Sequence, residues 1–139
     1  MAEMRRQDRL MNAADTLKVL REGEYGVLAT VDESMQPYGV PVNYVYLDDS
    51  IYFHSTNAGG QKYTNLVKNP KICFTVTGKT KVLPEQFGTL YESAIVYGTT
   101  ELIEDEGERM KAFLEFVNKY SVDFQDAGEK YIKADGKRQ

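Results

Sequence analysis

The sequence is poor in the residues that build disulfides and most metal centres. Its 139 residues include one cysteine, Cys73, one histidine, His54, and no tryptophan. A single cysteine excludes a disulfide within the chain and a metal site built on clustered cysteines, and a single histidine excludes a histidine-rich zinc site. Cys73 stands inside the apolar run Lys71–Val76, so we predict a buried, inert thiol rather than a nucleophile.

Long hydrophobic runs and an excess of positive charge are also missing. No stretch approaches the roughly 18–20 apolar residues of a membrane-spanning helix, and the charged N-terminus lacks the apolar core of a signal peptide. We therefore expect a cytoplasmic protein. The net charge of −4 gives no reason to expect a nucleic-acid surface. The one basic cluster, Arg5, Arg6 and Arg9, is either a solvated N-terminal arm or an anion contact.

The motifs of several common enzyme classes are absent. There is no Gly-x-Ser-x-Gly nucleophile elbow. There is also no Gly-x-x-x-x-Gly-Lys-Ser/Thr phosphate loop and no Gly-x-Gly-x-x-Gly dinucleotide fingerprint. Residue types alone leave a Ser-His-Asp triad open. The candidate site must therefore be sought in local patterns along the strands.

The composition fits a single domain spanning residues 1–139, with a polar arm at 1–9 and a weakly patterned tail at 121–139. The chain is 42% hydrophobic and 27% charged, and a chain of this length can bury a core without disulfides. The spacing of apolar residues and the positions of glycine and proline predict the elements. Helices are predicted at Asn12–Glu22, Gln61–Lys68 and Glu104–Tyr120, and strands at Tyr25–Val31, Tyr38–Leu47, Ile51–Thr56, Ile72–Thr77 and Tyr91–Ile103.

Three features of these elements make specific structural predictions. Pro41, inside Tyr38–Leu47, indicates an edge strand or a bulge because proline cannot donate to a ladder. Gly78–Gly88 reads as a loop. The buried stripe of the last helix is predicted from helical spacing to be Met110, Phe113, Leu114 and Val117.

The order of the elements predicts a mainly β protein with flanking α-helices. Consecutive strands joined by tight turns indicate an antiparallel sheet that curls into a barrel. A doubly wound α/β fold would need a helix after every strand, and the pattern does not show one.

The segment Tyr52–Lys62 has the parts of an anion site. Ser55 places a hydroxyl near a strand end, two glycines permit close approach of the backbone, and Lys62 lies in the first turn of the next predicted helix. A helix N-terminus with a lysine suits a phosphate monoester, whose charge needs several donors at once. The alternative is a plain strand–turn–helix connection with a solvated lysine.

The segment Tyr38–Tyr44 is a second candidate. A strand interrupted by Pro41 leaves backbone groups unpaired with a neighbour. Such groups could contact the pyrimidine edge of a flat heteroaromatic ring, whose faces would lie against apolar side chains. The alternative is a barrel strand rich in tyrosine and valine that binds nothing.

Together these segments make the chain similar to the small flavin-nucleotide-binding proteins of the pyridoxamine-phosphate-oxidase-like superfamily. The resemblance is particularly to the branch that includes 5-nitroimidazole resistance proteins. It covers nearly the whole chain to about residue 120. It is carried by Met4–Arg9, by Tyr25–Thr30 with Gln36–Tyr44, by Ile51–Ser55 with Gly59–Lys62 and Asn69–Phe74, and by Tyr91–Gly98.

The resemblance implies an antiparallel split β-barrel, homodimeric, with two flavin mononucleotide (FMN) sites at the subunit interface. The matching positions imply three groups of cofactor contacts. They are His54, Ser55 and Lys62 at the phosphate and ribityl end; Val42, Asn43 and Tyr44 along the isoalloxazine edge; and Tyr91, Glu92 and Ser93 from the partner chain. Arg5 and Arg6 would close over the site.

Two departures from the family pattern bear on function. Family members continue into a further barrel strand after the C-terminal helix, whereas residues 121–139 predict none, so an incomplete barrel is expected. The Arg- and His-containing substrate motif at the C-terminus of true pyridoxamine-phosphate oxidases is also missing. Oxidation of vitamin B6 is therefore not expected.

The resemblance implies a flavin-dependent oxidoreductase that reduces small nitro-aromatic or quinone-like acceptors. No catalytic acid–base residue is predicted, because the flavin itself carries the electron transfer. One alternative is a non-catalytic protein that carries flavin or haem, with His54 as the single possible imidazole ligand of the haem. Another is a cofactor-free dimer that keeps only the fold.

Overall fold

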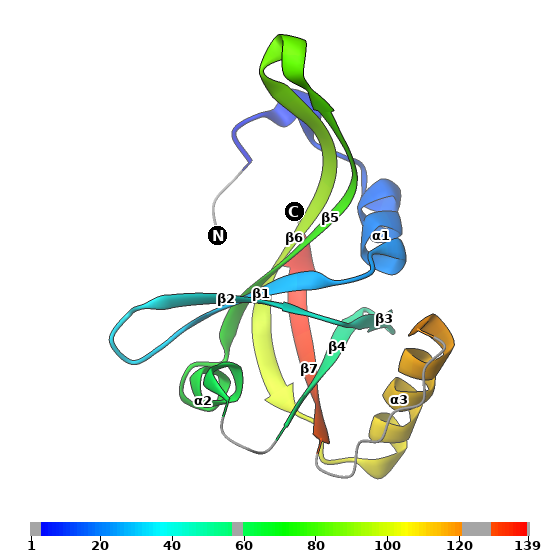
Figure 1. Cartoon of the computed structure of the whole chain (residues 1–139). Helices are drawn as coiled ribbons and strands as arrows, with labels where there is room; N and C mark the ends of the chain where they lie inside the picture. Colours follow the sequence, from blue (N-terminus) through cyan, green and yellow to red (C-terminus); the bar gives the residue numbers. More distant parts are fainter. Residues whose placement is uncertain (1–3, 57–59, 121–128, 139) are drawn as a thin grey trace.

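The computed structural model describes residues 4–56, 60–120 and 129–138 (Figure 1). Within these residues, no helix is long and apolar enough to cross a membrane. The helices are η1 (Gln7–Arg9, 3-10), α1 (Ala13–Glu22), α2 (Gln61–Lys68), η2 (Pro84–Gln86, 3-10) and α3 (Glu106–Tyr120). The strands are β1 (Gly26–Val31), β2 (Pro37–Val42), β3 (Val45–Leu47), β4 (Ser50–Thr56), β5 (Lys71–Leu83), β6 (Gly88–Leu102) and β7 (Glu129–Arg138).

The described strands form one antiparallel sheet in the order β2-β1-β5-β6-β7-β4-β3. The two edge strands, β2 and β3, are consecutive in the chain, with only Asn43 and Tyr44 between them. The sheet must therefore curl until its edges approach each other. Helices flank the sheet, which confirms the mainly β class (Figure 1). Pro41 lies on an edge strand, as predicted.

The predicted single strand Tyr38–Leu47 is wrong, because it divides into β2 and β3. At the division, the backbone of Tyr44 bonds to side chains from the end of α3 instead of to a neighbouring strand. Its N–H donates to the Tyr120 hydroxyl at 3.0 Å, and its carbonyl accepts from Lys119 Nζ at 2.9 Å. A local sequence pattern cannot predict these hydrogen-bond partners, since they lie 75 or more residues away in the sequence.

The predicted loop Gly78–Gly88 is also wrong. β5 continues to Leu83 and pairs with β6 back to Gly88, with a register shift between Thr77 and Thr80. Gly78 lies at this irregularity, so a glycine that suggests a loop marks a bulge inside a strand. The long hairpin projects from the sheet (Figure 1). Its tip places Phe87 at φ 51° and 98% exposed.

The prediction that no strand follows the last helix is wrong as well. β7 pairs with β6 on one side and β4 on the other, so it is an interior strand. A strand that pairs on both sides is held by backbone hydrogen bonds, which need no apolar pattern in the sequence. The expected incomplete barrel, which rested on the missing strand, therefore loses its basis. Residues 121–128 of the predicted tail lie outside the described residues.

The core divides between two buried clusters on opposite sides of β4. Phe53 belongs to the larger cluster with Leu28 and Phe74, while Tyr52 packs toward α3. Successive side chains of this strand thus enter different clusters, as the geometry of a β-strand requires. Cys73 is half-buried rather than buried, because the buried residues of β5 alternate and its neighbours Ile72 and Phe74 take the core face.

The buried stripe of α3 differs from the predicted one. Ala112 and Phe116 are the buried residues, whereas Met110 and Leu114 are each 57% exposed. The helix carries apolar residues on more than one side, so spacing alone does not select the stripe that meets β3 and β4. By contrast, α1 begins as predicted, because the Asn12 side chain caps it by accepting from the N–H of Asp15 at 2.8 Å.

Candidate functional site

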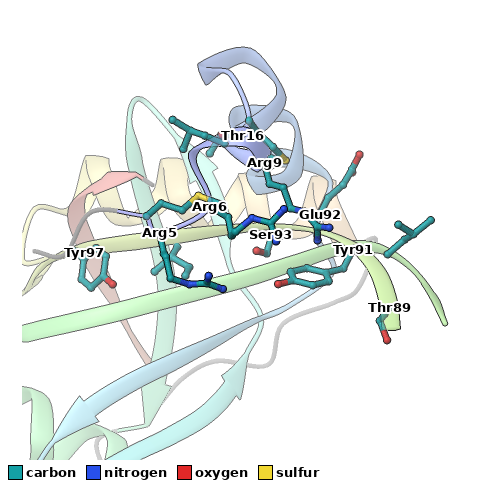
Figure 2. A pocket seen from close by; sticks show the side chains of 14 residues that line it. Arg5, Arg6, Arg9, Thr16, Thr89, Tyr91, Glu92, Ser93 and Tyr97 are labelled. Atoms are coloured by element: carbon teal, nitrogen blue, oxygen red, sulfur yellow. The ribbon is translucent and has the colours of Figure 1, made fainter. Parts of the chain in front are cut away.

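A cavity lies between the N-terminal arm and β6. It has a volume of about 810 Å³, and we call it the arm pocket (Figure 2). The arm contributes residues 4–11, and β6 contributes residues between Thr89 and Tyr97. Five residues expected near a flavin line it together: Arg5, Arg6, Tyr91, Glu92 and Ser93. Residues far apart in the sequence thus meet in one place.

The three arginines of the arm pocket differ in their partners. Arg6 donates from both Nε and Nη2 to the Asp8 carboxylate, at 2.9 and 2.7 Å. This exposed pair raises the pKa of Arg6 and lowers the pKa of Asp8. In the part of the chain whose side chains are described, no ion pair or hydrogen bond engages the guanidinium of Arg5 or Arg9. The charge of Arg9 also helps to lower the pKa of Asp8. With three arginines facing Asp8 and Glu92, the described part of the pocket keeps an excess of positive charge.

A second group of expected residues surrounds the start of α2. Lys62, in the first turn, donates from Nζ to the backbone carbonyl of His54 at 3.1 Å. The N-cap residue Gly60 offers no side-chain acceptor to the first turn. Among the residues with described side chains, none caps this helix start, and N–H groups at such a position suit an anionic ligand. The His54 ring packs edge-on against Phe116, with centroids 5.3 Å apart. The side chain of Ser55 and the turn residues 57–59 lie outside the described part of the structure.

The third group of expected residues is divided by the structure. The side chains of Val42 and Tyr44 are buried in the main core, and the Tyr44 hydroxyl donates to the Leu20 carbonyl. Asn43 instead lines a separate cavity of about 480 Å³, together with Lys119 and Tyr120. Of this group, Asn43 is the one that lines a described cavity.

The arm pocket and the start of α2 lie far apart in one chain. His54 pairs with Tyr131 of β7, and the next β7 residue, Ile132, pairs with Leu102 of β6. Ser93 therefore lies nine positions back along β6 from the level of His54, about 30 Å of strand at roughly 3.3 Å per residue. Figure 1 agrees, since α2 lies at the end of the sheet away from the β5–β6 hairpin tip. A single chain does not bring these two groups together.

Sequence reasoning missed residues at both cavities. In the arm pocket they include Leu10, Thr89 and Tyr97. Arg9 was recognised as part of the basic cluster, but it was not predicted as a residue of the site. No sequence pattern indicated that Lys119 and Tyr120 line the second cavity, because they stand at the end of an ordinary amphipathic helix. Lys119 Nζ lies 3.8 Å from the centroid of the Tyr44 ring, and burial lowers its pKa to about 8.

The burial of Lys119 predicts a rise in stability with pH. Between about pH 8 and its ordinary pKa of 10.5, the folded lysine has lost its proton while the unfolded one keeps it. The unfolded state then binds more protons, so the free energy of unfolding rises with pH. Above about pH 10 the trend reverses, because burial raises the pKa of Tyr44 and Tyr120 and the folded state then keeps more protons.

Urea unfolding of the wild type and of Lys119→Met between about pH 7 and about pH 10 measures this slope. The groups Arg21, Glu22 and Glu24 around the same cavity are shared by both proteins, so they cancel in the comparison. The wild type is expected to gain stability toward about pH 10 relative to the variant. Parallel curves would show that Lys119 keeps an ordinary pKa.

The fold and the family are established by comparison with known proteins. One similar structure is that of a Bacteroides thetaiotaomicron protein to which 5-nitroimidazole antibiotic resistance has been assigned. It is 24% identical to this chain, with a TM-score of 0.78, and the match covers 93% of this chain and 82% of that one. The conserved hypothetical protein Rv2991 of Mycobacterium tuberculosis is 17% identical, with a TM-score of 0.80, over 98% and 88%. An FAD-binding protein of Mesorhizobium loti is 22% identical, with a TM-score of 0.69, over 92% and 90%.

Because these sequence identities are low, the three structural similarities show the fold alone. Among curated proteins none matches this sequence. The family model described as pyridoxamine 5'-phosphate oxidase, however, matches residues 12–135, from the N-cap of α1 into β7. This match covers most of the chain and confirms the resemblance found in the sequence: the chain belongs to the pyridoxamine 5'-phosphate oxidase family.

Proposed function

We propose that this protein is an FMN-dependent oxidoreductase that reduces small nitro-aromatic or quinone-like acceptors. The observation that carries the proposal is the start of α2, where Lys62 and a helix N-terminus that has Gly60 as its N-cap residue adjoin the end of β4. Backbone N–H groups and an ammonium in one place suit the phosphate of a flavin nucleotide. Family membership and the fold shared with an FAD-binding protein support a flavin rather than another phosphate ester.

The residues of the chain would serve binding and orientation. Lys62 and the first turn of α2 would hold the phosphate, with Ser55 nearby in sequence. Asn43, at the break between β2 and β3, would present an amide to the edge of the ring. Bound flavin supplies hydride or electron transfer. The nearby groups of the protein would hold the ring in place and exclude water from it.

We further propose that the protein is a homodimer whose sheet closes into a split barrel, with each flavin site shared between two subunits. The support is the separation along β6: Tyr91, Glu92 and Ser93 stand far from Lys62 within a chain. If both groups contact one flavin, the second group must come from another copy. A twofold axis then produces two equal sites.

The test is an absorbance spectrum of the purified protein before and after addition of FMN, followed by titration. Saturation near one FMN per chain, with turnover of a nitro-aromatic or quinone acceptor and a nicotinamide donor, would support the proposal. A haem Soret band that is lost in His54→Ala would instead indicate a haem carrier. A colourless protein that takes up no FMN would contradict the cofactor assignment.

Lys62→Ala is expected to weaken FMN binding by about 1.5–3 kcal/mol, the range for a hydrogen bond to a charged group. This corresponds to a rise in the dissociation constant of roughly ten- to 150-fold. The matched control is Lys68→Ala on the same helix, whose exposed ammonium pairs with Glu33 at 2.6 Å. An unchanged dissociation constant in Lys62→Ala, or an equal loss in Lys68→Ala, would remove Lys62 from the phosphate site.

A further inference from the structure

The arm pocket contains positive charge that its own acidic residue does not balance. Arg5, Arg6 and Arg9 line it, and Glu92 is the acidic lining residue. Arg6 is already bound by Asp8 through two hydrogen bonds. Arg5 and Arg9 have no such partner among the residues with described side chains. Two guanidinium groups therefore line the cavity. Each is planar and carries several N–H donors, which can form paired hydrogen bonds to a negatively charged ligand group.

The same pocket offers exposed aromatic and apolar surface next to these charges. Tyr91 is 64% exposed and Leu90 is 57% exposed, while Leu10 on the arm is half exposed. Figure 2 shows the side chain of Arg5 reaching along β6 toward Tyr91. A flat ring that carries an anionic group would cover the apolar surface and bring its charge to the arginines.

The arm lies outside the part of the chain that the family model matches. The family model matches residues 12–135, so Arg5 and Arg9 precede the matched region. The match to the family model therefore does not by itself identify what Arg5 and Arg9 bind. The Lys62 group, which suits the flavin phosphate, lies elsewhere on the chain, so the arginines of the arm are not needed for that charge.

We propose that the arm pocket binds the electron acceptor, and that this acceptor is an aromatic compound bearing a carboxylate or sulfonate, held by Arg5 and Arg9. The inference rests on the proposed function, because an acceptor must lie beside the flavin. The arm pocket meets this need in the proposed dimer, since Tyr91, Glu92 and Ser93 line it and also face the flavin of the other subunit. The net preference of the pocket is for negative charge rather than for a neutral ring.

Two probes of nearly equal shape test the charge preference. Calorimetric titration of the FMN-saturated protein with 4-nitrobenzoate and with 4-nitrobenzamide compares an anionic with a neutral ring. The double variant Arg5→Gln/Arg9→Gln is expected to weaken 4-nitrobenzoate binding by about tenfold or more. Its affinity for 4-nitrobenzamide is expected to stay within about threefold. Lys18→Gln is the matched control, because this lysine is exposed on α1 and does not line the arm pocket.

Each other outcome overturns the inference in a recognisable way. Equal affinity of the wild type for the two probes would show that the pocket does not select charge. An equal loss in Lys18→Gln would show that the overall positive charge of the protein, not the charge of the arm, matters. A loss of FMN affinity in the double variant would assign the arginines to the flavin phosphate. Failure to take up FMN, with the preference for 4-nitrobenzoate retained, would overturn the flavin function and the acceptor role.

Discussion

A heterodimer that joins one Lys62→Ala subunit to one Tyr91→Ala subunit is expected to bind about one FMN, although each variant homodimer binds little. In the proposed dimer, Lys62 of one subunit and Tyr91 of the other serve the same site. One of the two sites in this heterodimer combines both substitutions, and the other site is intact. Two tags on co-expressed chains allow the heterodimer to be purified, and its flavin content is read from absorbance.

The size of the effect follows from the two losses. Lys62→Ala removes a charged hydrogen bond worth about 1.5–3 kcal/mol. Tyr91→Ala removes an aromatic face, worth roughly 1–3 kcal/mol against a stacked heteroaromatic ring. At an FMN concentration about three times the wild-type dissociation constant, the intact site is therefore about three-quarters filled, while the site that carries both substitutions stays nearly empty.

The matched control is a heterodimer of wild type with the double variant Lys62→Ala/Tyr91→Ala. It contains the same substitutions, but in the shared arrangement both of its sites are damaged. If each site were instead built by one chain, the pattern would reverse, and this control would bind the flavin. Comparing the two heterodimers thus tests the arrangement of the site separately from the strength of either contact.

Phe116→Ala is expected to lower the free energy of unfolding by about 3–5 kcal/mol, the cost of removing a phenylalanine from a core. Phe116 is fully buried and packs with Val45, Tyr52 and Ile103, where α3 meets the sheet. Its ring also lies edge-on to His54, so the loss of this contact would loosen the strand that precedes the proposed phosphate turn. Urea unfolding of the variant and the wild type measures the change.

Leu114→Ala provides the control for Phe116→Ala. It lies on the same helix but is 57% exposed, so its cost is expected to stay within about 0.5 kcal/mol. A large effect at Leu114 and a small one at Phe116 would mean that α3 packs through the stripe predicted from the sequence. The two substitutions thus decide between the predicted and the observed face of the helix.

Local sequence patterns were sufficient where a structural element depends on its own residues. Asn12 caps α1, Gly23 follows its end, and α2 stops before Asn69-Pro70. The strand predicted at Ile51–Thr56 is present as β4, and every second side chain of it points to the same side. The family also followed from the sequence, since the order of short motifs survives when overall identity is low.

For the site, the sequence supplied the chemical groups but not their distribution. The arginines of the arm and the segment Tyr91–Ser93 were recognised as separate stretches, and the structure brings them into one pocket. Val42, Asn43 and Tyr44 were recognised as one stretch, and the structure turns Val42 and Tyr44 into the core. Contacts between distant segments depend on how the sheet curls, which no local pattern records.

By itself, the sequence determined the family, the mainly β class, the ends of the first two α-helices and the candidate groups for binding an anion. Only the tertiary structure decided that Tyr38–Leu47 breaks at Asn43, that β7 lies inside the sheet, and that Ala112 and Phe116 form the buried side of α3. The physical reason is the same in each case. In each case the partners lie far away in the sequence. Side chains of α3 take the place of a neighbouring strand as hydrogen-bond partners of the Tyr44 backbone, and backbone hydrogen bonds to β4 and β6 hold β7 in the sheet. The shape of the sheet determines which side of α3 is buried.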